Sequence, residues 1–317
     1  MKVKAAPELL GKKSFAKRLG RDLRMNGGLY LLFIPVALFF ILFKYKPMGG
    51  LLIAFENYSP TTGMLGSDFV GLEHFKSFVS NPYFWRLMRN TITISGACLI
   101  FGFPAPIILA LLLNELTCKR FQRGVQLVAY LPHFISMIVI CGLITKFTAD
   151  RGIINDIMAF FGAERVSFLN YPKYFVPVYV ISGIWTDIGW NAIIYFAALT
   201  GIDKQLYEAA VIDGAGRFKQ VLHVTIPGIM PTIVTMLILQ IGNLLNLGYE
   251  KIILLYNPIT YETADVITTY VYRKGILEGS FSFSTAVGLF NSVLNFALLY
   301  IANTVSRKAG EGSLWES

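Results

Sequence analysis

The sequence predicts an all-α membrane protein with six transmembrane helices, and three observations support this fold class. Of the 317 residues, 55% are hydrophobic and only 15% are charged, whereas a soluble domain carries about 25% charged residues. The apolar residues form long runs, and about 20 such residues cross a bilayer as a helix. Lysine and arginine collect in short segments between these runs. Together these features predict one membrane domain over residues 25–306.

Each predicted span is an apolar run, and only the fourth contains a charged residue, Asp187. The spans cover residues 25–43, 91–113, 124–145, 174–200, 227–249 and 281–306. Basic residues precede the first run, as in a signal peptide, but the run is long and no A-x-A site follows, so we expect an uncleaved anchor. Prolines should kink or start several of these helices. They are Pro104, Pro106, Pro132, Pro177 and Pro231.

The distribution of positive charge predicts the orientation. Cations are concentrated in the tail at 1–24, in the loops after spans two and four, and in the tail at 307–317. Short cation-rich segments stay on the cytoplasmic side, so both termini are predicted to be cytoplasmic. The segments 44–90, 146–173 and 250–280 then lie outside. Within them, Gly49–Phe55 is too short to span and is expected to lie on the membrane or re-enter it.

The loop at 201–226 carries more information than a polar connector would. Asp203 is a plausible N-cap for a short helix, Asp213-Gly214 offers a turn, and a second short helix around Arg217–His223 leads to Pro227. A helix–turn–helix with exposed apolar and acidic residues suits docking into a groove on a partner.

A specific pattern in this loop resembles the EAA loop of ABC importer permeases. It consists of Glu208-Ala209-Ala210, three residues, Gly214, nine residues, and then an apolar stretch that ends in Pro227. The resemblance implies a coupling helix that sits in a cleft of an ATP-hydrolysing subunit, with Glu208 pairing with a basic residue there. The implied coupling residues are Glu208, Ala209, Ala210, Asp213, Gly214, Arg217 and Pro227.

The resemblance extends over nearly the whole chain, including NTITIS, YLPHFIS and GNLLNLGYEKIILLYNPITYETADVITTYVYRKG. These stretches are similar to maltose-type sugar permeases, in the branch that imports polysaccharides or oligosaccharides. The resemblance implies an N-terminal helix plus a five-helix core. It also implies two ATPase subunits that bind ATP and magnesium, a second homologous permease and an extracytoplasmic solute-binding protein. No cofactor is expected in this chain.

Polar residues inside the spans are costly and therefore candidates for a substrate path. Some lie in spans five and six: Gln240, Asn243, Asn246, Asn291 and Asn295. Others lie in span four: Asp187, Trp190, Asn191 and Tyr195. Amides could bind sugar hydroxyls and aromatic rings could stack on sugar faces. The competing interpretation is that small and amide residues only hold helices together, and for Asn291 and Asn295 the two interpretations are equally weighted. Asp187 could also be an ion-pair partner.

Missing motifs exclude several functions. There is no G-x-x-x-x-G-K-[ST] loop, so the chain is not expected to hydrolyse ATP. The three histidines lie in separate predicted regions, so no metal site is expected. An ion-coupled secondary transporter or channel is the main alternative, but such proteins usually show repeats and intramembrane charges. A membrane enzyme is disfavoured because no catalytic motif is present.

Overall fold

The computed structural model describes residues 24–308 and 310, so residues 1–23 of the first predicted tail and residues 309 and 311–317 of the second lie outside the described residues. Internal contacts divide the chain into two units, one up to Leu52 and one from Ile53 onward.

The first unit, which ends at Leu52, contains most of an apolar helix that covers Gly27–Phe55. Its segments are α2 (Gly27–Phe40), a π-helical turn (Ile41–Tyr45), α3 (Lys46–Met48) and a 3-10 segment (Gly49–Phe55). The first predicted span is therefore helical, and Gly49–Phe55 continues the same helix instead of forming a separate surface segment. No residue of α2, the π-helical turn or α3 is buried. A helix this apolar needs lipid or another chain around it.

The second unit contains the other long helices. The second span joins α5 (Phe84–Ala97), a π-helical turn (Cys98–Gly102) and α6 (Pro104–Asn114). The third comprises α7 (Lys119–Tyr130), a 3-10 turn (Leu131–Phe134) and α8 (Met137–Phe147). The fourth is α10 (Pro172–Thr200). The fifth joins α12 (Arg217–Gln220), a π-helical turn (Val221–Thr225) and α13 (Ile226–Gly242), and the sixth is α17 (Phe281–Lys308).

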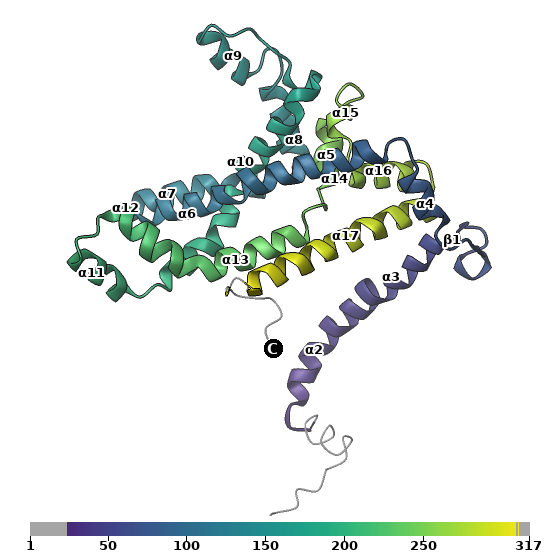
Figure 1. Ribbon diagram of the computed structural model, residues 1–317, viewed down its shortest axis with the longest axis horizontal. Helices are drawn as coiled ribbons and strands as arrows, with labels where there is room; N and C mark the ends of the chain where they lie inside the picture. Colours follow the sequence, from purple (N-terminus) through teal and green to yellow (C-terminus); the bar gives the residue numbers. More distant parts are fainter. Residues whose placement is uncertain (1–23, 309, 311–317) are drawn as a thin grey trace, which may run out of the picture. The chain divides into compact units, whose positions relative to one another are not determined.

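Short elements connect these helices. Strands β1 (Glu56–Asn57) and β2 (Asp68–Phe69) pair antiparallel, with Glu56 opposite Phe69. The other connecting helices are α4 (Glu73–Val79), α9 (Ile153–Phe160), α11 (Lys204–Ile212), α14 (Tyr249–Leu255), α15 (Tyr261–Ala264) and α16 (Ile267–Tyr272). Three 3-10 or π-helical turns complete the list: Met64–Gly66, Phe168–Asn170 and Arg273–Leu277. Within this unit, α11 lies at the end opposite α4 and α16 (Figure 1), as the predicted inner and outer loops require.

Among the described residues, four helices are long and apolar enough to cross a membrane, and the bent pair α7–α8 gives a fifth span if it is counted as one. The four are Gly27–Phe55, Phe84–Asn114, Arg217–Gly242 and Phe281–Lys308. α10 has 29 residues, which is about 43 Å of helix and long enough to span, but it falls outside this apolar class. The count of six spans therefore stays a prediction.

Two predicted spans are interrupted. The third bends by 103° between Phe134 and Met137, where Ile135 and Ser136 adopt extended backbone directly after the 3-10 turn that contains Pro132. The fifth helix ends at Gly242 instead of at 249, and the chain then runs without regular structure to α14. Both breaks lie beside polar side chains from other helices.

Three of the π-helical turns have a common cause. The turns at 41–45, 98–102 and 221–225 each precede a proline, which is Pro47, Pro104 or Pro227. A proline ring clashes with the carbonyl four residues before it, and in each case that carbonyl lies inside the π-helical turn. The wider turn relieves the clash, so the helix continues through the proline.

Two apolar clusters hold α10 at the centre of the second unit. One includes Ile94, Ile140, Phe175 and Ile252, from α5, α8, α10 and α14. The other joins α6, α10 and α13 around Ala110, Ala192, Tyr195 and Ile229. A Cβ on Gly189 would collide with the Ala129 carbonyl, so glycine is what lets α7 approach α10 this closely.

Candidate functional site

The loop at 201–226 has the local geometry that its sequence predicts. Asp203 caps α11, because its Oδ1 accepts a hydrogen bond from the Gln205 N–H at 3.0 Å. The helix ends at a turn in which Gly214 has φ of +74°. The N–H of Ala215 donates to the Ala210 carbonyl at 2.8 Å and that of Gly214 to Val211 at 3.0 Å. This is a Schellman motif, and it requires the left-handed backbone that glycine adopts readily.

The second part of the loop is not a separate short helix. α12 continues through the π-helical turn into α13, so residues Arg217–Gly242 form one helix of 26 residues. Two hydrogen bonds tie the loop to this helix. The hydroxyls of Tyr207 and buried Thr225 are 3.0 Å apart, and Gln220 Nε2 donates to the Ala215 carbonyl at 2.8 Å. α11 is therefore fixed to the start of a membrane helix.

The face of the loop that points away from the long helices is exposed and carries large apolar side chains. Ile212 is 85% exposed and Phe218 is 81% exposed. A hollow of about 390 Å³ lies beside α11, lined in part by Ala209, Ala210 and Asp213. The exposed carboxylate of Glu208 pairs with no other residue in the part of the chain that the structure describes. Arg217 is exposed at the start of α12, and Pro227 lies within the long helix. This surface is shaped to dock against another protein.

A cavity of about 520 Å³ lies between α10, α13, α14 and the middle of the second span, around Cys98, Gly102 and Pro106. Its polar lining comes from Asp187, Asn191, Tyr195, Gln240, Glu250 and Lys251. A second hollow of about 350 Å³ also has Gln240 in its lining and adds Asn243. Five of the predicted path residues therefore line these two spaces, namely Asp187, Asn191, Tyr195, Gln240 and Asn243. The volume lies in the range of small-molecule sites.

Asp187 also forms an ion-pair contact, as one of the sequence-based alternatives allows. Its Oδ1 lies 3.0 Å from Nδ1 of His133, which sits in the 3-10 turn before the bend of the third span. The His133 ring stacks on Trp190, with centroids 4.6 Å apart and planes 7° apart. Trp190 is 45% exposed and does not line the 520 Å³ cavity. These three residues thus fasten the bend to α10 at the edge of the cavity.

The remaining predicted path residues lie elsewhere. Asn295 Oδ1 accepts from the Leu245 N–H at 3.0 Å, and Asn291 Nδ2 donates to the Leu245 carbonyl at 3.4 Å. Both asparagines are buried on α17, where they satisfy the backbone that is freed beyond Gly242. Asn246 is exposed, and none of the three lines either space. The contacts of Asn291 and Asn295 match the helix-packing interpretation.

Lys251 was missed by the sequence reasoning. It lies on α14, is 7% exposed, and lines the 520 Å³ cavity. Its Nζ donates to the Tyr179 carbonyl at 3.0 Å and lies 4.6 Å from the centre of the Tyr179 ring. Lys251 belongs to the segment 250–280, which was predicted to lie outside the membrane, and no site role was predicted for it. The available signal was a single lysine inside the apolar run YEKIILLY.

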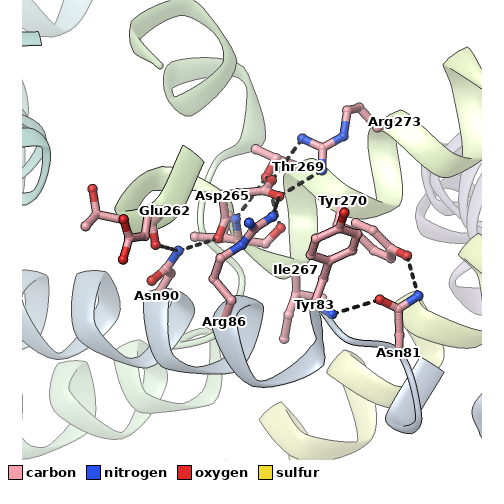
Figure 2. A network of polar contacts seen from close by, with 12 residues as sticks. Asn81, Tyr83, Arg86, Asn90, Glu262, Asp265, Ile267, Thr269, Tyr270 and Arg273 are labelled. Atoms are coloured by element: carbon pink, nitrogen blue, oxygen red, sulfur yellow. Dashed lines mark hydrogen bonds and ion pairs between the residues drawn. The ribbon is translucent and has the colours of Figure 1, made fainter. Parts of the chain in front are cut away.

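A buried ionic network fixes the segment after α14 onto α5 (Figure 2). Asp265 is fully buried; its two oxygens accept from Arg273 at 3.0 and 2.8 Å, and Arg86 contacts it at 3.4 Å. Asn90 Nδ2 donates to the carbonyls of Glu262 and Asp265, both at 2.9 Å. Burial alone would lower the pKa of Arg273, but the hydrogen bonds and charge of Asp265 outweigh it and raise that pKa.

Comparisons with known proteins agree on one family. The profile of the family described as "Binding-protein-dependent transport system inner membrane component" matches residues 102–310. The polygalacturonan/rhamnogalacturonan transport system permease protein YteP of Bacillus subtilis (strain 168) is 44% identical over 98% of this chain and 97% of its own length.

Solved structures give the same picture. A chain of a bacterial ABC transporter for import of the acidic polysaccharide alginate has a TM-score of 0.84 and 41% identity, over 92% of this chain and 99% of its own length. In a structure of a bacterial alginate ABC transporter with an alginate pentasaccharide-bound periplasmic protein, the matching chain has a TM-score of 0.86. It is 40% identical over 94% of this chain and all of its own length.

Proposed function

The chain belongs to the family of binding-protein-dependent transport system inner membrane components, and we propose that it forms part of the path by which an oligosaccharide of acidic type crosses the cytoplasmic membrane. Family membership confirms the resemblance drawn from the Glu208–Pro227 pattern. The protein is a membrane-embedded permease of an ABC importer, not an enzyme, and membership disfavours the ion-coupled alternative. The acidic substrate class rests on the relatives that import polygalacturonan and alginate.

One observation supports the coupling mechanism above all others. The exposed loop and the cavity share the single helix Arg217–Gly242, whose first nine residues carry the two loop contacts and whose last turn carries Gln240. This helix is about 39 Å long. A displacement of α11 by an ATPase subunit would therefore move one wall of the cavity, which is what alternating access requires.

The surface of the loop fits the partner that this mechanism needs. The loop presents Ile212 on α11 and Phe218 on α12 together with the exposed Glu208, a combination that suits an apolar groove with a cation at its rim. Asp213 and Gly214 form the turn between α11 and α12. Ala209 and Ala210 line the hollow beside α11, and their small side chains leave room there for a side chain of the partner. We assign the docking contact to this face.

The substrate path is proposed to run along the polar side of the cavity. Asn191 and Gln240 can donate to and accept from sugar hydroxyls, and Tyr195 offers a ring. The placement of Asn243 beside the second hollow extends this surface. Asn246, Asn291 and Asn295 are proposed to be less important, because they do not line either space.

The rest of the assembly and its orientation are also proposed. Two ATPase subunits would bind ATP and magnesium, a second homologous permease would complete the path, and an extracytoplasmic binding protein would deliver the sugar. The cation-rich loop at 201–226 would face the cytoplasm, which places both termini there as well.

Purification of the tagged chain in mild detergent tests this proposal. We expect an ATPase subunit and a second permease to co-purify, and we expect Glu208→Lys to release the ATPase subunit or to uncouple it. The matched control is Glu164→Lys, since Glu164 is also exposed but lies in a predicted outer segment. Recovery of the chain alone, with transport in proteoliposomes that lack ATP, would contradict the proposal.

A further inference from the structure

We propose that Lys251 is the residue that recognises the acidic group of the substrate, by binding a sugar carboxylate inside the 520 Å³ cavity. This inference rests on the proposed function and adds a specificity-determining residue to it.

The position of Lys251 is unusual for a charged residue. It is 93% buried, on a short helix whose other buried residues are Ile252 and Leu255. An ionised group in such a place is costly unless an opposite charge or several hydrogen bonds compensate it. Within residues 24–308 and 310, no carboxylate lies within 4.0 Å of its Nζ. The ammonium therefore has a buried charge without a direct counter-charge.

The hydrogen bonds of Lys251 leave room for a ligand. An ammonium has three N–H donors, and one of them is directed to the Tyr179 carbonyl at 3.0 Å. The Tyr179 ring covers one side of the group at 4.6 Å. Because Lys251 also lines the cavity, two donors remain for a group that enters it. A carboxylate supplies both the acceptors and the missing negative charge.

Glycine at position 183 makes this placement possible. A Cβ built on Gly183 would lie 3.3 Å from Lys251 Nζ, and Gly183 itself lines the cavity. The ammonium thus lies directly against the backbone of α10, and a side chain at 183 would push it. The position of the charge is therefore set by two helices, α10 and α14.

The other charged groups of the cavity are carboxylates, and they do not neutralise Lys251 directly. Asp187 is engaged by His133 at 3.0 Å, and Glu250 is exposed in the first turn of α14. Both can accept hydrogen bonds from sugar hydroxyls. An acidic sugar would then be oriented with its carboxylate at Lys251 and its hydroxyls toward Asp187 and Glu250.

The experiment uses the complete importer in proteoliposomes with its binding protein and ATPase subunits. The probes are short oligomers of galacturonate and of alginate, and carboxyl-reduced galacturonate oligomers with the same linkage but no charge. We expect Lys251→Met to lower uptake of an acidic oligomer by about tenfold, as for loss of a charge-assisted hydrogen bond. Lys251→Arg should retain most of the uptake, and Gly183→Ala should lower it less than Lys251→Met.

Uptake of the carboxyl-reduced oligomer separates recognition from folding. A recognition role predicts that Lys251→Met changes neutral uptake little, whereas a merely structural role predicts an equal loss for both probes. If Lys251→Met lowered acidic and neutral uptake equally, or did not lower acidic uptake, the inference would be overturned. In either case, ATP-driven import by the unchanged protein would still uphold the proposed function. ATP-driven import of neutral oligomers alone would overturn both the inference and the acidic substrate class, but not the assignment as an ABC importer permease. No ATP-driven import of any probe would overturn the inference and the proposed function.

Discussion

The loop at 201–226 and the segment at 249–280 both connect long helices, but they are built in opposite ways. The loop is defined by near neighbours: the Asp203 carboxylate accepts from the N–H of Gln205, only two residues further along the chain, and Gly214 makes the turn. The segment is held by partners that are distant in sequence, since Asp265 binds Arg86 and the Ile267 N–H donates to Thr91 at 3.1 Å. The loop is also exposed for a partner, whereas the centre of the segment is buried.

This contrast separates a part of the permease that is held rigidly from a part that is exposed for contact with a partner. A buried ionic network costs much to disturb because each lost partner leaves another charge unpaired. A substitution in an exposed loop changes the stability of the protein little, but it can abolish the contact with a partner. Changes in the segment should therefore alter folding, and changes in the loop should alter coupling.

The largest expected effect comes from removal of the Asp265 carboxylate. Asp265→Ala leaves Arg273 and Arg86 without their shared partner and should destabilise the protein by about 3 kcal/mol. Thermal unfolding of the purified chain measures this loss. Asp156→Ala removes an exposed pair with Arg165 and should cost less than about 1 kcal/mol. Similar stability losses in the two variants would show that the buried network is unimportant.

A smaller effect is expected at Gly214, but it should appear in coupling. A side chain at φ of +74° strains the turn by roughly 1–2 kcal/mol, so Gly214→Ala should reduce substrate-stimulated ATP hydrolysis several-fold. Gly216 provides the control, because its φ is −69° and an added Cβ there has no neighbour within 4 Å. Equal activity of the Gly214 and Gly216 variants would contradict the assigned turn.

The cavity should respond to loss of a single amide. Gln240→Ala removes a side chain that lines both spaces and should raise the KM for uptake about fivefold, as for loss of a hydrogen bond of about 1 kcal/mol. Asn246→Ala should leave the KM unchanged, because Asn246 lies outside both. If the two variants had the reverse effects, the path would run elsewhere.

The smallest effect is expected at the contact between α11 and the long helix. Tyr207→Phe removes the 3.0 Å contact with Thr225, so it should lower stability by about 1 kcal/mol and uptake by about two- to threefold. Thr225→Val alone and combined with Tyr207→Phe completes a double-mutant cycle. Additive losses would mean that the two hydroxyls do not act together.

The sequence predicted features that depend on local chemistry. Apolar runs located the helices, Asp203 and Gly214 marked the cap and turn, and the spacing around Glu208 identified the family. The break at Pro132 was expected because proline acts on its own neighbours. The orientation of the termini and the number of spans remain predictions.

Features that depend on distant contacts were not predicted. Beyond Gly242, Asn295 of α17 accepts a hydrogen bond from the freed Leu245 N–H, and this partner on another helix is not apparent from residues 227–249. Lys251 lies in the cavity because α14 folds back against α10, whereas its sequence position suggested an outer loop. The same limit applies to Asn291 and Asn295, whose polar character fitted both a path and a packing role.

The central claim is that Arg217–Gly242 moves as one rigid helix between the coupling loop and the cavity. Electron spin resonance distances between labels at Phe218→Cys and Leu239→Cys test it in the complete importer, after replacement of Cys98, Cys118 and Cys141. These positions are about 32 Å apart along a helix. We predict the same distance in nucleotide-free and ATP-trapped states, while the distance from Leu239→Cys to a label at Val293→Cys on α17 changes. A change of several ångströms between 218 and 239 would mean that the π-helical turn bends, which contradicts the claim.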